Sequence, residues 1–232
     1  MTQTSRASRP ARPTTPPRSD GKPTGKPTGK PTRKPPRAPR PRVPPGEVRL
    51  IGGQWKRSKL PVVNAPGLRP TPDRVRETLF NWLGQDLSGW RCLDAFAGSG
   101  ALGFEAASRG AAEVVLLERD GDLVASLEAS RLRLGGAAMR VLRADALAWM
   151  RTSSPQGFEL IFLDPPFDAD IAPAALGAAK RLLSAGGYLY FESSQKLTTE
   201  GIGAGWAVWR HARAGAVHAH LLRRSDTLPS FV

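Results

Sequence analysis

The chain has 232 residues, of which 40% are hydrophobic and 23% are charged, which is enough for one sizeable hydrophobic core. Its single cysteine, Cys92, excludes an intramolecular disulfide, and no apolar run approaches the roughly 18 residues that a membrane-spanning helix needs. The composition thus excludes a disulfide-rich secreted domain and a helical membrane protein, and we expect a soluble cytoplasmic protein.

The formal net charge of +14 is concentrated in the first 45 residues. That segment carries 12 Lys and Arg against one acid, holds 13 of the 22 prolines, and repeats Gly-Lys-Pro-Thr three times over residues 21–32. Such a composition cannot bury enough apolar surface to offset the entropy of ordering, so residues 1–45 are predicted to be a disordered basic tail. Two roles stay open for the tail: an arm that contacts RNA phosphates, or a solubilising extension. The remaining residues, 46–232, are predicted to form one domain.

A hairpin and a helix are predicted at the start of this domain, over residues 46–85. The stretch EVRLIGGQWKRSKLPVV (47–63) contains two short β-like runs around a Gly-Gly pair. In RPTPDRVRETLFNWLG (69–84), Thr71 is the predicted N-cap and Pro72 the first helical residue. The apolar face of this helix is predicted to comprise Val75, Leu79, Trp82 and Leu83. Its arginines are predicted to point elsewhere: Arg69, Arg74 and Arg76.

The rest of the domain, residues 86–232, alternates apolar runs with helix-length segments. The predicted strands are 91–96, 113–118, 139–144, 158–164 and 187–192, and the predicted helices between them are 101–109, 120–134, 147–152 and 172–183. Continuous apolar strands that alternate with helices indicate a parallel sheet covered on both faces. Two final runs, 206–213 and 216–224, are predicted to close the sheet as an antiparallel hairpin. The predicted fold class is therefore α/β: a doubly wound, mostly parallel, seven-stranded Rossmann-like sheet with a C-terminal antiparallel hairpin.

A glycine-rich turn follows the first of these strands. The stretch DAFAGSGALG (94–103) places Gly98, Gly100 and Gly103 in a G-x-G-x-x-G pattern, which lets the backbone approach a ligand closely. The helix that follows offers N–H groups to an anionic group. Glu118 ends the next strand, 20 residues after Gly98, where a carboxylate can accept hydrogen bonds from ribose hydroxyls. On these grounds NAD, FAD and S-adenosylmethionine (SAM) all remain open.

Two further acids favour one of these ligands. Asp94 stands directly ahead of the glycines, where it suits a cationic group, such as the amino group of a methionine, better than a pyrophosphate. Asp145 follows the third strand and is placed to meet an adenine amino group. The alternative for an isolated acid at a strand end is helix capping. Three acids around one glycine turn favour SAM.

The fourth strand ends in Asp164-Pro165-Pro166-Phe167. Two prolines in series remove two backbone donors and hold the chain extended. The Asp164 carboxylate and the Pro165 carbonyl then form an array of acceptors, while Phe167 supplies a flat face. An exocyclic amino group on a planar base has two donors for these acceptors and a ring that can stack. The sequence therefore resembles the [DNS]-P-P-[FYW] catalytic loop of amino-group methyltransferases, with a rigid turn as the alternative.

Several segments together resemble the RsmD family, whose members methylate the N2 amino group of one guanine in bacterial small-subunit ribosomal RNA. They are VRLIGGQWKRSKLPV, GLRPTPDRVRETLFNWL, CLDAFAGSGALGFEAASRGA and FLDPPF, and the resemblance runs from about residue 48 to residue 224. It implies a class I methyltransferase fold and SAM as the cofactor. The implied substrate is guanine 966 of 16S rRNA, presented in the small ribosomal subunit or an assembly intermediate.

The motifs and the resemblance define three sets of candidate residues. The catalytic set is Asp164, Pro165, Pro166 and Phe167. The cofactor-binding set is Thr71, Asp94, Phe96, Gly98, Gly100, Glu118, Arg119, Asp145 and Ala146. The RNA-binding set is Lys56, Arg57, Arg69, Arg74 and Arg76, against the alternative that these cations form a solvated face.

The expected chemistry is direct methyl transfer to a weakly nucleophilic nitrogen. Hydrogen bonds from guanine N2–H to Asp164 and to the Pro165 carbonyl should favour a more tetrahedral nitrogen in line with the methyl group. The base must leave its stack or be unpaired already, with Phe167 as its stacking partner. Three rivals remain: an NAD-dependent oxidoreductase, a non-catalytic ribosome-assembly factor, and a methyltransferase that acts on another RNA or DNA base.

The other residues with reactive side chains are not assigned a function. The three histidines of the chain, His211, His218 and His220, fall in the C-terminal hairpin without the Cys, Asp or Glu spacing of a metal site. They are predicted to be ordinary strand residues, and Cys92 is predicted to be buried and inert. We expect a monomer that needs neither a metal nor a membrane.

Overall fold

The computed structural model describes residues 46–62, 71–155, 157–166 and 171–227. The described residues all belong to one compact unit, residues 42–232. The predicted tail over 1–45 lies outside the described residues and stays a prediction. In the described part of the chain, no helix has the length and apolar composition needed to cross a membrane.

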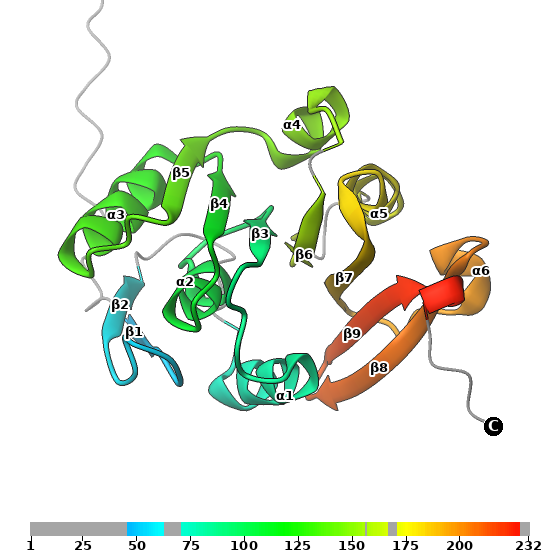
Figure 1. Ribbon diagram of the computed structural model, residues 1–232, viewed down its shortest axis with the longest axis horizontal. Helices are drawn as coiled ribbons and strands as arrows, with labels where there is room; N and C mark the ends of the chain where they lie inside the picture. Colours follow the sequence, from blue (N-terminus) through cyan, green and yellow to red (C-terminus); the bar gives the residue numbers. More distant parts are fainter. Residues whose placement is uncertain (1–45, 63–70, 156, 167–170, 228–232) are drawn as a thin grey trace, which may run out of the picture. The chain divides into compact units, whose positions relative to one another are not determined.

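A seven-stranded sheet forms the centre of this unit, in the order β5-β4-β3-β6-β7-β9-β8 (Figure 1). Its strands are β3 (Arg91–Asp94), β4 (Glu113–Glu118), β5 (Met139–Arg143), β6 (Phe158–Leu163), β7 (Leu183–Ser193), β8 (Trp206–Ala214) and β9 (Val217–Arg224). The first five run parallel, whereas β9 is antiparallel to both β7 and β8. The predicted fold class is confirmed. The chain runs outward from β3 to β5 and returns at β6, so a topological switch point lies between β3 and β6, where ligands bind in folds of this type.

Helices cover both faces of the sheet. They are α1 (Asp73–Leu83), α2 (Ala101–Ser108), α3 (Gly121–Arg133), α4 (Ala146–Thr152), α5 (Ala172–Lys180) and α6 (Thr199–Ile202). The first three bury Leu79, Phe104 and Leu127 in one apolar cluster, and the last three bury Met150, Leu176 and Ile202 in another. Successive strand residues point to opposite faces, which is why the strands read as continuous apolar runs.

The predicted N-terminal hairpin is present as β1 (Gly46–Arg49) and β2 (Lys59–Val62), paired antiparallel. Its loop is held against α2, because the Ser108 hydroxyl donates to the Gly52 carbonyl at 2.6 Å. A glycine is required at Gly53, where φ is +71° and a Cβ would lie 1.8 Å from the Ser108 carbonyl oxygen. The indole of Trp55 packs on Phe104, with ring centroids 6.2 Å apart. These contacts fix the hairpin to the face of the sheet that α1 and α2 cover.

Helix α1 differs from its prediction in two ways. It begins at Asp73, and the Pro72 carbonyl accepts from Val75 N–H at 2.9 Å, with no side-chain cap. The predictions that Thr71 caps the helix and that Pro72 is its first residue are therefore wrong, because Pro72 is the N-cap. The placement of Arg76 off the apolar face is also wrong, because Arg76 is completely buried. The helix ends at Gly84, which adopts a left-handed φ of 92° and donates to the Phe80 carbonyl.

Candidate active site

Five acidic residues stand at or just beyond the carboxyl ends of neighbouring parallel strands. In sheet order they are Asp145 after β5, Glu118 on β4, Asp94 on β3, Asp164 after β6 and Glu192 on β7. Adjacent strands lie about 4.8 Å apart, so this order places the acids in a row across the sheet, where its parallel strands end. We call this side of the sheet its C-terminal edge. The sequence predicted four of them and missed Glu192. The topological switch point falls in the middle of the row, between Asp94 and Asp164.

The glycine turn is built around two of these acids, Asp94 and Glu118. Gly103 donates its backbone N–H to Asp94 Oδ2 at 2.9 Å, and a Cβ on Gly103 would lie 3.1 Å from the same oxygen. Gly98 donates its N–H to Glu118 Oε2 at 3.0 Å, which ties the turn to β4. Gly100 has φ +78°, and a Cβ there would meet Leu127 at 2.5 Å. Gly100 and Gly103 thus each have a structural reason, and Gly103 orients an acid as well as letting α2 pack.

Asp94 is 2% exposed, and burial raises its pKa to about 7. Hydrogen bonds from the Gly103 and Phe96 backbones lower this pKa, while the nearby Glu118 and Glu192 carboxylates raise it. A buried carboxyl without a cationic partner favours its neutral form. A cation bound beside Asp94 would restore the charged form, so the group is suited to a positively charged ligand.

Asp164 and Glu192 form a second pair of carboxyls on the other side of the switch point. Burial, followed by the charges of Glu192 and Asp94, raises the pKa of Asp164 well above its usual range. Burial also raises the pKa of Glu192, which is 3% exposed and accepts a hydrogen bond from the Tyr190 hydroxyl at 2.7 Å. The Thr71 hydroxyl faces both carboxyls and lowers both pKa values. Thr71 therefore reaches this edge, as the cofactor set predicted, although it does not cap α1.

The Asp164-Pro165-Pro166 segment follows β6 directly, without regular secondary structure. Pro165 is buried, whereas Pro166 is exposed, so the segment passes from the core to the surface within two residues. Phe167 lies outside the described residues, and its stacking role stays a prediction.

The remaining cofactor candidates lie at the same edge, on the β3–β4–β5 side. Phe96 is half-buried beside the glycine turn, and Arg119 is exposed directly after β4. Asp145 accepts the Ala148 N–H at 2.8 Å and is the N-cap of α4, which begins at the buried Ala146. Asp145 thus caps a helix while its exposed side chain stays at the edge. Asp145 Oδ1 caps the helix, and the other carboxylate oxygen remains able to accept a hydrogen bond from a ligand. Helix capping and the predicted ligand binding are therefore compatible.

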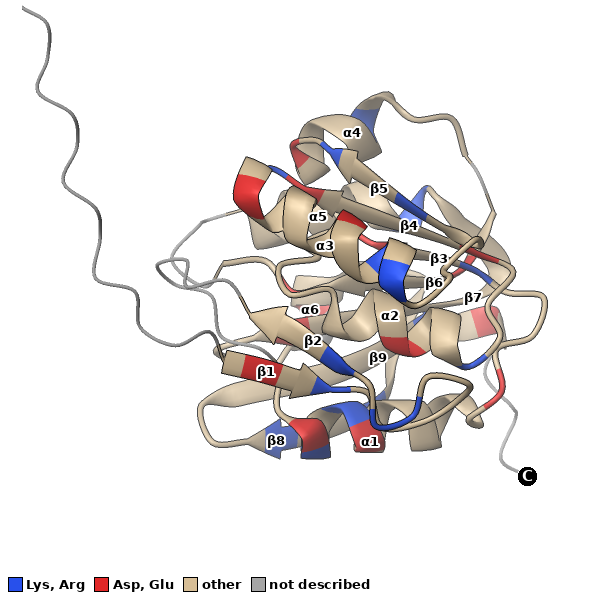
Figure 2. Ribbon diagram, turned by 90° about the vertical axis from the view of Figure 1, so that its left-hand side faces the viewer, with Lys and Arg blue, Asp and Glu red and all other residues tan. Residues whose placement is uncertain are grey.

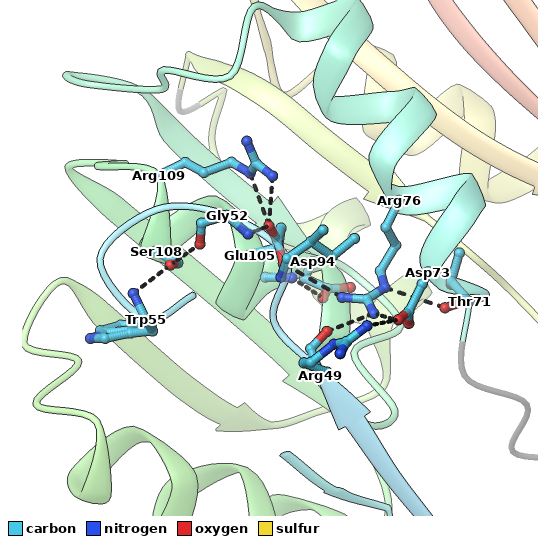
Figure 3. A network of polar contacts seen from close by, with 12 residues as sticks. Arg49, Gly52, Trp55, Thr71, Asp73, Arg76, Asp94, Glu105, Ser108 and Arg109 are labelled. Atoms are coloured by element: carbon cyan, nitrogen blue, oxygen red, sulfur yellow. Dashed lines mark hydrogen bonds and ion pairs between the residues drawn. The ribbon is translucent and has the colours of Figure 1, made fainter. Parts of the chain in front are cut away.

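A buried polar network connects the hairpin loop to this edge (Figure 3). Glu105 on α2 accepts backbone N–H groups from Ile51 at 2.9 Å and Gly52 at 2.7 Å. It also pairs with Arg109 at 2.7 Å and with Arg76 at 3.5 Å.

The Arg76 guanidinium extends this network to the residue before α1. It donates to the Thr71 carbonyl at 3.3 Å, to the Arg49 carbonyl at 2.8 Å and to the Asp73 carboxylate at 2.6 Å. Arg76 thus joins the hairpin, α2 and Thr71. Among the RNA-binding candidates that the structure describes, Arg76 is the one in the interior, so we assign it to this network instead.

Lys and Arg positions also occur on the loop between β1 and β2 and on α1 (Figure 2). Lys56, Arg57 and Arg74 are exposed, while Arg69 lies outside the described residues. A pocket of about 450 Å³ separates the hairpin loop from α1, and Lys56 and Glu77 are among its lining residues. These exposed cations can reach a polyanion, and RNA binding by them stays a prediction.

The sheet order, the glycine turn and the row of acids define a class I methyltransferase fold. A family model described as "Conserved hypothetical protein 95" matches residues 48–223. The "Ribosomal RNA small subunit methyltransferase D" of Escherichia coli K12 is 40% identical over 186 residues, 77% of this chain and 91% of that relative. The protein of the same name from Haemophilus influenzae is 46% identical over 134 residues, 56% of this chain and 69% of that relative.

Solved structures agree with these matches. The "Putative methyltransferase yhhF" from Escherichia coli superposes with a TM-score of 0.69 at 39% identity, covering 77% of this chain and 98% of that one. RsmC, a 16S rRNA N2 methyltransferase from Thermus thermophilus in complex with AdoMet and guanosine, superposes with a TM-score of 0.60 over 78% of this chain and 50% of that one. At 23% identity, this second match supports the fold alone. The chain belongs to the RsmD family, which confirms the resemblance that its motifs carry.

Proposed function

We propose that this protein transfers a methyl group from SAM to the exocyclic N2 amino group of guanine 966 in 16S rRNA. Its substrate in this proposal is the small ribosomal subunit, or an assembly intermediate of it, in the cytoplasm. The relative that is 40% identical is by name a ribosomal RNA small subunit methyltransferase, which supports the reaction and the class of RNA. The observation that carries the proposal is the Asp164-Pro165-Pro166 segment at the end of β6, beside Asp94 and Glu192.

SAM fits the groups at this edge of the sheet. In our proposal, Asp94 holds the methionine ammonium, and the backbone of Gly98 and Gly100 borders the methionine end. Glu118 uses its remaining lone pairs for the ribose hydroxyls, because each of its oxygens already accepts one N–H, from Gly98 and from Asp120. The adenine end is assigned to Asp145. Other residues of this edge flank the cofactor: Thr71, Phe96, Arg119 and Ala146.

The positive charge of SAM complements the acidic groups of the site. In SAM the methyl group is carried by a sulfonium, so it can be transferred without help from a metal or a covalent enzyme intermediate. The Glu192 charge raises the pKa values of both Asp94 and Asp164, and the Asp94 charge raises that of Asp164, so a cation among these carboxyls lowers the free energy of their charged forms. The cofactor product, which has lost its methyl group, carries no sulfonium charge. It therefore lacks this attraction, which favours its release.

Asp164 is the group that we assign to the reacting nitrogen. An ionised Asp164 and the Pro165 carbonyl accept the two N2–H donors of guanine, which orients the nitrogen lone pair toward the methyl group. As the N–C bond forms, nitrogen becomes positively charged, and Asp164 is positioned to stabilise that charge and to accept the proton. Glu192 does not contact the base in this assignment. Its carboxyl raises the pKa of Asp164 and thereby makes Asp164 a stronger base once ionised.

The test is transfer of a labelled methyl group from SAM to small ribosomal subunits from a strain that lacks the corresponding methyltransferase. Digestion and mass spectrometry of the RNA then identify the modified base and its position. We expect one N2-methylguanine per subunit, at guanine 966. Transfer to an adenine, or to DNA alone, would overturn the proposed substrate but retain the methyltransferase. Absence of SAM binding by calorimetry would overturn both.

A further inference from the structure

We propose that His211, His218 and His220 form a binding site for one divalent transition metal of the zinc class. The proposal is independent of methyl transfer, and it revises the sequence-based prediction that these are ordinary strand residues. His211 lies on β8, while His218 and His220 lie on β9, and the two strands pair so that His211 is opposite His220. One potential ligand nitrogen from each ring lies within 4.8 Å of the other two.

Two of the rings are already close to the geometry that a metal needs. His211 Nε2 and His218 Nδ1 are 3.0 Å apart and share a hydrogen bond. Two nitrogens bound to one tetrahedral zinc at 2.0–2.1 Å lie about 3.3 Å apart, so the pair would open by only a few tenths of an ångström. A metal would take the place of the shared proton, and each ring would carry its proton on the other nitrogen.

The third ring is oriented by a backbone carbonyl. His220 Nδ1 lies 3.3 Å from the Phe191 carbonyl oxygen, which only accepts, so Nδ1 carries the proton. The lone pair is therefore on Nε2, where it accepts the Leu197 N–H at 3.0 Å. A carbonyl that fixes the tautomer of a histidine is the usual outer partner in a zinc site. Metal binding would exchange the Leu197 N–H, which lies in an irregular segment, for the metal.

The surroundings of these rings favour neutral imidazole, the form that binds a metal, over the protonated form. Burial lowers the pKa of His220 to about 4, and burial followed by the charge of His218 lowers the pKa of His211. Protons therefore compete weakly for these two nitrogens at neutral pH. Imidazole ligands without carboxylates select zinc, cobalt, nickel or copper over magnesium or calcium. Lys196 acts in the opposite direction, because its charge lowers both pKa values and would repel a dication.

The composition of the chain makes the test specific. These are the only three histidines of the chain, and its only cysteine, Cys92, is fully buried. Protein made without a histidine tag and stripped with a chelator is titrated with Zn²⁺ by calorimetry, and with Co²⁺ by visible absorption. We expect one metal per chain, a rise in the melting temperature with Zn²⁺, and none of these effects with Mg²⁺.

Two variants and three controls locate the site. His211→Ala and His218→Gln each remove a half-buried ligand, and each should weaken Zn²⁺ binding by more than the roughly 10–100-fold that loss of an outer partner costs. Arg213→Ala, an exposed change between these histidines, and Cys92→Ser should leave binding unchanged. Lys196→Gln should tighten it. The absence of 1:1 binding at millimolar Zn²⁺, or equal binding by the folded histidine variants, would overturn the proposal.

Discussion

Two groups of buried carboxyls lie in this molecule, and their surroundings are opposite. Glu105, completely buried, is matched by two guanidinium groups and two backbone N–H groups. Asp94, Asp164 and Glu192 face one another, and among the described residues no salt bridge joins them to a cation. A buried charge without a partner costs several kcal/mol or takes up a proton. The first group therefore stabilises the fold, while the second favours its protonated form until, as we propose, a positively charged ligand binds beside it.

The largest effect is expected from Asp164→Ala in the unpaired group. Loss of its carboxylate should reduce methyl transfer by roughly 10²–10⁴-fold, because the variant can neither orient the guanine amino group nor accept its proton. Affinity for SAM should fall much less, since Asp94 and the glycine turn remain. The rate is measured by single-turnover transfer to the small subunit, and the affinity by calorimetry.

The matched change is Asp226→Ala, which removes an exposed acid near the end of β9 and should leave both quantities unchanged. Asp164→Ala should also leave the protein at least as stable as the wild type, because it relieves repulsion within a buried acidic cluster. An active Asp164→Ala enzyme would remove Asp164 from the mechanism.

The second effect concerns the paired group. Glu105→Gln should lower the free energy of unfolding by about 3–5 kcal/mol, because it leaves the buried guanidinium groups of Arg76 and Arg109 without their countercharge. Urea denaturation measures this loss. Glu77→Gln, an exposed change on α1, should alter stability by no more than about 0.5 kcal/mol. Equal stabilities for the two variants would mean that the Glu105 network does not stabilise the hairpin and α1.

The difference between the two groups also explains what the sequence could and could not reveal. Strand and helix positions along the chain follow from local apolar periodicity, and the glycine turn and Asp164-Pro165-Pro166 are recognisable as contiguous motifs. The sequence misplaces Arg76 because Glu105 and Arg49, which hold it in the interior, are distant in sequence, while its local ion pair with Asp73 is equally compatible with an exposed arginine. Glu192 was missed because it ends a strand without a motif. The rule that parallel strands end at one edge would have found it, next to Asp164.

The third effect is a pH dependence that arises from Asp94. Its pKa is raised from 3.8 to about 7 in the folded protein, so the folded state binds the extra proton between these values. The stability of the ligand-free protein should therefore fall as the pH rises from 4 to 7, by a few kcal/mol at most. SAM affinity should do the opposite and increase as the pH rises through about 7, because a cation binds the ionised carboxyl. Urea denaturation and calorimetry at several pH values measure the two trends.

Two comparisons isolate this effect. Asp94→Asn should remove most of the pH dependence of SAM affinity, since Asn does not titrate in this range. S-adenosylhomocysteine, which lacks the sulfonium charge, should show a shallower dependence than SAM. If SAM affinity fell with rising pH, or if the Asn variant kept the full slope, Asp94 would not be the group that meets the cation.

The smallest effect is expected from Gly103→Ala, which acts on Asp94 indirectly. An added Cβ would lie 3.1 Å from Asp94 Oδ2 and from Leu116, so both side chains must move away by a few tenths of an ångström. Alanine is the better helix former by about 1 kcal/mol, which offsets this crowding in the unfolding free energy. The shifted carboxylate should then cost SAM less than about tenfold in affinity, or 1.4 kcal/mol. Gly100→Ala is the contrasting change, because its φ of +78° and a 2.5 Å approach to Leu127 should destabilise the turn itself. Complete loss of SAM binding in a stable Gly103→Ala protein would instead mean that Gly103 borders the ligand directly.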